Sequence, residues 1–237
     1  VAVSERETVV IQDWSTEDSP MWAPMKTGTY DVYFYARDEL GTQEQAQIII
    51  NVRQPFEDVN SGDWYYEYVE SIYANRIMTG LDSTHFGPGD SLARAQFATI
   101  LHRLNGTPTV GYTARFRDVA AGAWYTDAIL WAADTNVVTG YSNGNFGPGD
   151  NINREQMALM MYRYANYKNY DTSKKADFTQ YQDADRVSSF AREAMRWAVG
   201  NGIITGKYNE TVLDPQGNAS RAECATIITR FMNMYGG

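Results

Sequence analysis

The stretch FGPGDNINR at residues 146–154 repeats, with few changes, the stretch FGPGDSLAR at residues 86–94, which lies 60 residues earlier. Three further pairs keep the offset of 60: FEDV at 56–59 with FRDV at 116–119, WY at 64–65 with WY at 124–125, and TG at 79–80 with TG at 139–140. So many matches in one register identify an internal duplication, which is typical of repeat architectures.

A third and more diverged copy follows the first two. Its matches are Asp183 for Asp118, Thr205 for Thr139, Pro215 for Pro148 and Arg221 for Arg154, at offsets that drift from 65 to 67 residues. The drift indicates small insertions in connecting loops, which tolerate them. Residues 168–180 absorb most of the difference and are expected to form an exposed linker. We therefore predict repeats at residues 55–106, 107–166 and 167–237.

Each repeat is expected to form a helix, a turn and a second helix. In the second copy, residues 126–136 place Ile129, Ala132 and Ala133 on one face, and Gly140 is expected to stop this helix. The second helix is predicted over residues 154–164. Its apolar positions recur in all three copies: Phe97, Ile100, Leu101 and Leu104; Met157, Met160, Met161 and Tyr164; Cys224, Ile227, Ile228 and Phe231. Three equivalent amphipathic helices predict a mainly α-helical fold with a shared core.

The first 54 residues differ in kind from the repeats. Residues 8–12, 29–36 and 45–52 have the alternating or apolar pattern of strands, and residues 38–41 read as a hairpin turn. An immunoglobulin-like sandwich needs about seven strands, so we interpret residues 1–54 as the C-terminal part of a larger β domain. The pattern Trp22, Pro24, GTY at 28–30 and Asp38 resembles the closing strands of triple-tyrosine or other immunoglobulin-like modules.

Composition narrows the class of protein. The 237 residues, 43% of them hydrophobic, suffice for a filled core, and a formal charge of −9 argues against binding to nucleic acid. No apolar run is long enough to cross a bilayer, and residues 1–10 lack the features of a signal peptide. A single cysteine excludes an internal disulfide and a cysteine-based metal cluster.

The predicted second helices start with related tetrapeptides: ARAQ at residues 93–96, NREQ at 153–156 and SRAE at 220–223. Ser220 and Glu223 have the spacing of a capping box, in which a hydroxyl and a carboxylate satisfy two free amides of the first turn. Asn153 with Gln156 is a workable variant. Ala93 has no side-chain acceptor, which is expected to cost about 0.5–2 kcal/mol relative to a serine there.

An arginine follows the cap in every copy, although the helix dipole favours an acid in the first turn. One explanation is a ligand, because a helix start offers free amides and a guanidinium can add a bidentate clamp on a carboxylate. The other is that the arginines pair with Asp58, Asp118 and Asp183 and hold the repeats together. Chemistry alone leaves both explanations open.

The pattern F-x-D-V, W-Y, T-G, G-x-F-x-P and a T-R-A-E-like tetrapeptide resembles that of S-layer homology domains, over about three quarters of the chain. The resemblance implies a three-pronged, pseudo-threefold spindle around a helical bundle. It also implies non-enzymatic anchoring at the bacterial cell wall or cell surface, outside the cell, by binding a secondary cell-wall polysaccharide that carries pyruvylated N-acetylmannosamine in grooves between repeats. The alternative is a structural module for surface-layer lattice assembly, with self-association.

The resemblance also implies a set of ligand-binding residues. They are Arg94, Arg154 and Arg221 of the tetrapeptides, Gly80, Gly140 and Gly206 of the T-G pairs, Asp58 and Asp118 of the F-x-D-V motifs, and Trp64 and Trp124. Core packing is the competing role for these two tryptophans, and it is the favoured role for Trp131 and Trp197. An indole offers a flat surface to the C–H face of a sugar.

Departures from the family pattern predict unequal grooves. The first copy has Ala93 in place of a hydroxyl residue, and the third has Ser189-Phe190 where the others have Trp-Tyr. The third copy also reads LDP at residues 213–215 in place of FGP. We therefore expect the groove that contains Arg154 to bind best.

Other chemistry is not indicated. His85 is expected in a turn and His102 on the exposed side of a helix, without metal-ligand spacing, and Cys224 as a small buried hydrophobe. No nucleophile motif, phosphate loop, zinc signature or cofactor site is predicted. A polysaccharide hydrolase would need two acids that face one cleft, and we expect Asp58 and Asp118 to cap turns instead.

Overall fold

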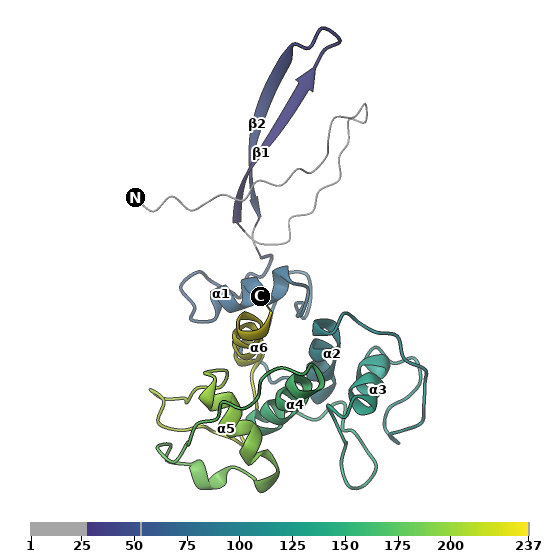
Figure 1. The fold of residues 1–237 in the computed structure, drawn as a ribbon, viewed down its shortest axis with the longest axis vertical. Coiled ribbons are helices and arrows are strands. Elements are labelled where there is room, and N and C mark those ends of the chain that lie inside the picture. The colour runs from purple at the N-terminus through teal and green to yellow at the C-terminus, as the bar shows by residue number, and fades with distance from the viewer. Residues whose placement is uncertain (1–27, 53, 237) are drawn as a thin grey trace. The chain divides into compact units, whose positions relative to one another are not determined.

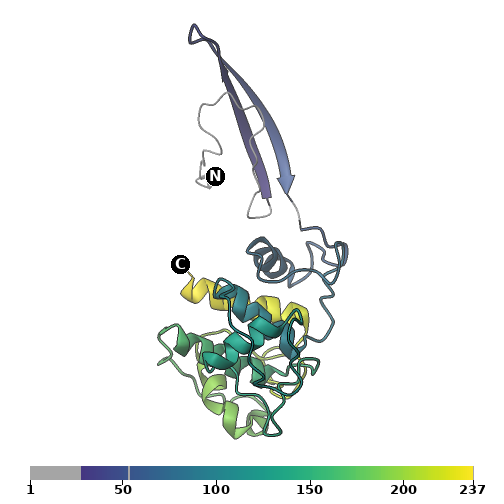
Figure 2. The ribbon, with the colours of Figure 1, turned by 90° about the vertical axis from the view of Figure 1, so that its right-hand side faces the viewer.

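The computed structural model describes residues 28–52 and 54–236. The chain divides into two compact units, residues 1–53 and residues 54–237, which are described separately (Figures 1 and 2). The strand expected at residues 8–12 lies outside the described residues, as do Trp22 and Pro24. In the described ranges, no helix is both long enough and apolar enough to cross a membrane.

The described part of the first unit is a two-stranded antiparallel hairpin. Strand β1 (Gly28–Arg37) pairs with β2 (Gln43–Val52), with Val32 opposite Ile48. The turn is held by Asp38, whose Oδ1 accepts hydrogen bonds from the amides of Leu40 at 2.9 Å and Thr42 at 2.8 Å. The two strands and the turn expected here are confirmed, whereas the assignment to an immunoglobulin-like domain stays a prediction.

In the described part of the second unit each repeat contributes two helices, as the repeats predict. The pairs are α1 (Tyr66–Ala74) with α2 (Arg94–Leu104), α3 (Thr126–Asp134) with α4 (Arg154–Tyr167), and α5 (Arg192–Gly200) with α6 (Arg221–Tyr235). Two short 3-10 turns, η1 (Ala184–Arg186) and η2 (Ser189–Ala191), precede α5. Helix α3 ends before the expected Gly140, because Asn136 already takes a left-handed φ of 58°.

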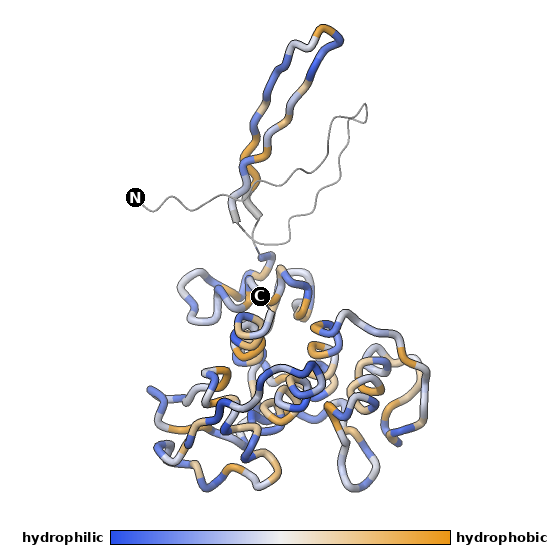
Figure 3. The backbone as a smooth tube through the Cα atoms, viewed as in Figure 1, coloured by the Kyte–Doolittle hydropathy of each residue, from blue (hydrophilic) through white to orange (hydrophobic). Residues whose placement is uncertain are grey.

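The repeats close into a ring. The first helix of each repeat packs on the second helix of the repeat before it, so α3 packs on α2 and α5 packs on α4. Helix α1 completes the cycle by packing on α6, which joins the first repeat to the last (Figure 1). The predicted apolar stripes of α2, α4 and α6 are buried apart from the half-buried Leu104, and they form one core. In Figure 3, which colours the backbone by hydropathy, hydrophobic residues alternate with polar ones along the helices.

Three backbone hydrogen bonds form a closed cycle just before the second helices. The amide of Leu92 donates to the carbonyl of Ala219 at 3.0 Å, and the amide of Ala219 donates to that of Ile152 at 3.0 Å. The amide of Ile152 donates to the carbonyl of Leu92 at 2.8 Å and completes the cycle. All three residues are fully buried. Each repeat is therefore both donor to one neighbour and acceptor from the other.

The starts of the second helices are also satisfied by the neighbouring repeat. The amides of Arg94 and Ala95 donate to the carbonyls of Asp150 at 2.9 Å and Pro148 at 3.2 Å. The equivalent amides of α4 and α6 donate to residues 215–217 and 88–90. The free amides that the sequence led us to expect for an anion are therefore occupied at the first two positions of each helix, because the next repeat supplies carbonyls.

The predicted caps are confirmed. The amide of Gln156 donates to Asn153 Oδ1 at 2.8 Å, and the amide of Glu223 donates to Ser220 Oγ at 3.2 Å. In the first repeat only the reverse bond forms, from the amide of Ala93 to Gln96 Oε1 at 2.9 Å.

The expectation for His102 is wrong. Its side chain is buried, with a ring nitrogen 2.9 Å from the carbonyl oxygen of Pro108 and the ring centroid 5.4 Å from that of Trp131. The helical periodicity of α2 leaves this face polar, but α3 of the next repeat covers it. Cys224 is buried as expected, and burial raises the pKa of its thiol.

Replacing Ala93 by serine is expected to stabilise the protein by about 0.5–2 kcal/mol, because the new hydroxyl supplies the missing acceptor for the amide of Gln96. Urea unfolding measures the change, and Asn153→Ala is the matched control, with a loss of similar size. A destabilising Ala93→Ser together with a neutral Asn153→Ala would contradict this account of the caps.

Candidate functional site

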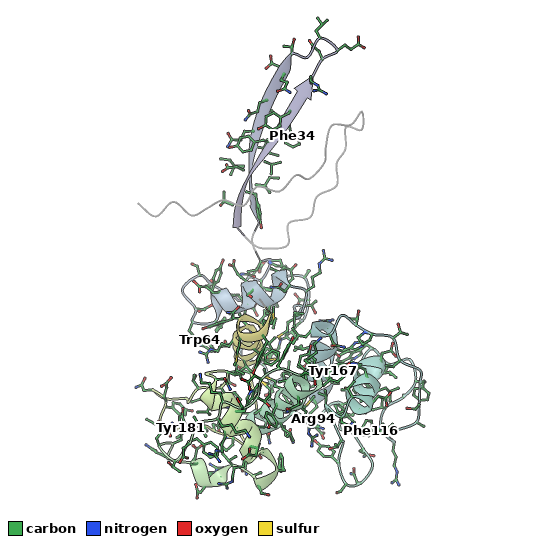
Figure 4. All side chains as sticks on the ribbon, in the orientation of Figure 1. Phe34, Trp64, Arg94, Phe116, Tyr167 and Tyr181 are labelled. Carbon is green, nitrogen blue, oxygen red and sulfur yellow. The ribbon has the colours of Figure 1, made fainter. Side chains whose placement is uncertain are left out.

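The three tetrapeptide arginines are buried and reach from one repeat to the next. Arg94 Nε donates to the carbonyl of Phe146 at 3.0 Å, inside the helical unit (Figure 4). Arg154 Nε donates to Leu213 at 2.8 Å, and Arg221 Nε donates to Phe86 at 2.6 Å. Each arginine is the first residue of its helix, so all three side chains reach the neighbouring repeat in the same way. The last arginine returns to the first repeat.

The aspartates of the F-x-D-V motifs hold the turns that these arginines contact. Asp58 accepts hydrogen bonds from the amides of Phe86 at 2.8 Å and Gly87 at 2.7 Å. Asp118 and Asp183 make the equivalent pairs of bonds in their own repeats. The arginine and the aspartate therefore bind the same turn. The carboxylate accepts hydrogen bonds from two successive amides, and the guanidinium donates to the carbonyl between them. Turn capping is the role that the structure gives Asp58 and Asp118, and their ligand binding stays a prediction.

We call each arginine with the turn it contacts a junction, named after the arginine. The Arg221 junction uses a second donor, because Arg221 Nη2 donates to the carbonyl of Thr79 at 2.7 Å. The Arg154 junction uses all three nitrogens. There Nη2 donates to the carbonyl of Thr205 at 2.8 Å and Nη1 donates to Glu223 Oε1 at 3.4 Å.

The Arg94 junction is the open one. Within residues 28–52 and 54–236, neither terminal nitrogen of Arg94 has a hydrogen-bond acceptor; the residue as a whole is only 6% exposed, but these two nitrogens are not fully buried. Its guanidinium lies over the rings of Tyr141, at 4.6 Å from the centroid, and Phe146, at 4.8 Å. Burial lowers the pKa of Arg94, which nevertheless keeps its charge at neutral pH. Two charged amino groups are thus left for another acceptor.

An ion network occupies the Arg154 junction. Lys207 Nζ lies 2.9 Å from Asp214 Oδ2 and 3.0 Å from Glu223 Oε1, the oxygen that also accepts from Arg154. Burial disfavours the charge of Lys207, but the bonds to Asp214 and Glu223 outweigh it and raise its pKa above the ordinary value. This junction therefore neutralises its own cations.

Exposed aromatic residues stand two positions before the first helix of each repeat. Trp64 is 63% exposed and Trp124 is 66% exposed, each edge-on to the tyrosine that follows. Phe190, two positions before α5, is 55% exposed and takes the same place. The sequence alignment of Ser189-Phe190 with Trp-Tyr is therefore wrong by one residue, because η2 sets the register. Trp131 and Trp197 are buried, in the core role that was favoured for them.

The glycines of the T-G pairs have a packing role. A Cβ atom at Gly140, whose φ is 72°, would collide with the ring of Phe116. Gly80 meets Phe56 in the same way, and Gly206 meets Tyr181. A side chain would push the aromatic ring of the F-x-D-V motif, or its counterpart, out of the core. Their part in ligand binding stays a prediction.

Sequence reasoning overlooked the residue that follows each T-G pair. Leu81, Tyr141 and Lys207 occupy this position, and the last two contact the arginine or its network. Three unlike residues at one repeat position were a visible signal that the junctions differ.

A ring of three repeats, each tied to the next by a buried arginine, defines a closed repeat module. The family model described as "S-layer homology domain" matches residues 55–98, 115–158 and 180–225, more than half of the chain. The chain belongs to the S-layer homology domain family. These domains are non-catalytic and anchor surface proteins to the cell wall, so the chain is a cell-surface module.

Similar proteins carry these repeats beside other parts. The chain is 32% identical over 178 residues to an endoglucanase of Bacillus sp. (strain KSM-635), covering 75% of this chain and 19% of that protein. It is 27% identical over 166 residues to the surface-layer 125 kDa protein of Lysinibacillus sphaericus, covering 69% and 14%. It is 26% identical over 181 residues to a cellulosome-anchoring protein of Acetivibrio thermocellus, covering 75% and 38%. The chain thus spans a fifth or less of the first relatives that it matches.

Replacing Arg221 by alanine is expected to destabilise the protein by about 2–3 kcal/mol, because two buried carbonyls lose a charged donor. Arg196, an exposed arginine of α5 with an ion pair to Glu193 at 3.9 Å, supplies the control, and its alanine variant should change stability by less than about 0.5 kcal/mol. Urea unfolding of both variants measures the difference. Equal effects would show that the ring does not depend on this arginine.

Proposed function

We propose that this chain anchors a protein to the bacterial cell wall by binding an anionic wall polysaccharide, of the pyruvylated N-acetylmannosamine type, at the Arg94 junction. The observation that carries the proposal is the buried guanidinium of Arg94 with two terminal nitrogens that lack an acceptor in the described part of the chain. A pyruvate ketal supplies a carboxylate, and the guanidinium fork matches a carboxylate in a bidentate manner.

The setting of Arg94 strengthens such a contact. A pair of opposite charges attracts more strongly where water is partly excluded than at an exposed surface. The net charge of −9 makes the chain as a whole repel anions, so binding has to come from a local site rather than from a general positive field. Among the described residues, no carboxylate is hydrogen-bonded to Arg94, although Asp150 and Asp118 lie close enough to favour its charge.

An exposed indole is expected beside this arginine. In the third repeat, the residues before α5 lie next to the start of α4, because Ser188 donates to Glu155 Oε2 from its amide at 2.9 Å and to Oε1 from its hydroxyl at 2.7 Å. The equivalent residues before α3 include Trp124, and the equivalent helix start in the first repeat carries Arg94. Trp124 then offers an apolar face to the sugar ring whose carboxylate Arg94 holds.

This proposal changes the expected order of ligand affinity among the three junctions. The sequence put the Arg154 groove first, but the terminal nitrogens of Arg154 already donate within the protein. Arg221 is intermediate, since one of its terminal nitrogens donates to Thr79. We therefore rank the Arg94 junction first and the Arg154 junction last.

Lattice assembly is the second candidate, favoured by relatives named as surface-layer proteins. They include the S-layer protein of Bacillus thuringiensis subsp. finitimus, 27% identical over 183 residues. Ordered self-association of the purified chain without polysaccharide, measured by analytical ultracentrifugation, would support this function. A monomer that binds the polymer would support anchoring.

Arg94→Ala is expected to weaken binding of purified pyruvylated wall polymer by about tenfold or more, because a charged hydrogen-bond pair is lost. Isothermal titration measures the affinity, Arg196→Ala is the control, and polymer stripped of pyruvate is the second ligand. Wild type should prefer the pyruvylated polymer, and Arg94→Ala should bind both alike. Equal binding of the two polymers by wild type would overturn the carboxylate mechanism.

Trp124→Ala is expected to weaken the same binding several-fold while leaving the melting temperature within about 2 °C of wild type, because the indole is 66% exposed. Leu40→Ala in the hairpin, at a residue 93% exposed, is the control for loss of an exposed apolar side chain. Unchanged polymer affinity in Trp124→Ala would remove this residue from the site.

A further inference from the structure

The Arg154 junction differs from the other two at three equivalent positions. Glu223 stands where the other repeats have Gln96 and Gln156, Asp214 stands where they have Gly87 and Gly147, and Lys207 stands where they have Leu81 and Tyr141. The other repeats carry an aspartate three residues later, Asp90 or Asp150, where the third has Gly217, so the charges peculiar to this junction are the carboxylate of Glu223 and the ammonium group of Lys207.

We propose that the chain's own carboxylates take the place of the ligand at the Arg154 junction, so that this junction is a structural lock and not a binding site. The inference rests on the proposed function, because it names the junction from which the anionic polymer is excluded and the residues that exclude it. Glu223 is the specificity-determining residue, and Asp214 holds Lys207 beside it.

The geometry matches that of an internal ligand. One oxygen of Glu223 lies between two cations, 3.4 Å from Arg154 Nη1 and 3.0 Å from Lys207 Nζ. Asp214 binds the other side of Lys207 at 2.9 Å. The remaining terminal nitrogen of Arg154 donates to the carbonyl of Thr205. Every nitrogen of Arg154 therefore has an acceptor in its own protein, in contrast to Arg94.

The bonded network of Arg154, Lys207, Glu223 and Asp214 has two cations against two carboxylates, and Arg230 and Asp183 add one charge of each sign nearby. An incoming carboxylate would meet two negative groups and would have to displace Glu223 from Arg154 before it could bind. The Arg154 side chain is almost fully buried and that of Glu223 largely so, which strengthens both the existing pair and the repulsion of a second anion. Exclusion therefore follows from charge as well as from occupied donors.

The other repeats supply substitutions that open the lock without disturbing the backbone. The side chain of Gln156 accepts a hydrogen bond from the amide of its cap residue Asn153, and Glu223 accepts the equivalent bond from Ser220. Glu223→Gln therefore keeps this capping bond. Asp214 has a left-handed φ of 52°, and its counterparts Gly87 and Gly147 have φ values of 70° and 75°. Asp214→Gly therefore suits the local conformation.

The test measures the affinity for pyruvylated wall polymer by isothermal titration in four proteins. They are wild type, Arg94→Ala, Glu223→Gln/Asp214→Gly, and the triple variant that combines all three changes. We expect the triple variant to bind at least tenfold more tightly than Arg94→Ala, because Arg154 and Lys207 become free. Glu39→Gln/Glu44→Gln, placed on Arg94→Ala, removes the same two negative charges from exposed hairpin positions and should restore nothing.

The outcomes separate the two proposals. If the folded triple variant binds no better than Arg94→Ala while wild type binds well, the lock is overturned and the anchoring function stands. The same holds if the hairpin control restores as much binding as the triple variant. If Asp214→Gly lowers the melting temperature by more than about 5 °C, Arg94→Ala/Glu223→Gln carries the test, with a gain of at least threefold expected. Wild type that binds no polymer overturns the anchoring function and the lock with it.

Discussion

The cycle of three backbone hydrogen bonds between Leu92, Ile152 and Ala219 is the constraint on which the rest of the helical unit depends. Each bond joins two different repeats, so burying these residues without the neighbouring repeat's amide and carbonyl would cost about 1–3 kcal/mol for each unsatisfied group. An open stack of repeats needs special end repeats with polar outer faces. A closed ring of three has no ends and satisfies the first repeat with the last.

The ring also explains why an arginine stands at every helix start against the preference of the helix dipole. The amides there donate to the carbonyls of the next repeat, so they no longer present a free positive end to the solvent. The arginine follows those amides and binds the same neighbouring turn through Nε. The arginines do hold the repeats together, but Nε does so through backbone carbonyls and not by pairing with Asp58, Asp118 or Asp183. Ligand binding by their terminal nitrogens stays a prediction.

The helices, their caps and their buried stripes were predictable because side-chain type and spacing encode them. The acceptors of the arginines were not, because a backbone carbonyl such as that of Phe146 has no residue-specific signal. The polar face of α2 predicted an exposed His102, and only the covering helix α3 corrects this. The position of Phe190 was missed by one residue, since a 3-10 turn in a diverged copy shifts the register. The ranking of the junctions depended on which terminal nitrogens of the three arginines already donate within the protein, and these acceptors lie far away in the sequence.

Ring closure has a mechanical consequence for an anchor. Tension from the N-terminal side enters the helical unit through residue 54, next to the first repeat. That repeat is held on both sides, by α2 against α3 and by α1 against α6, with Arg221 bound to its turn. A pull applied at residue 54 therefore loads two helix interfaces in parallel instead of unzipping a terminal repeat.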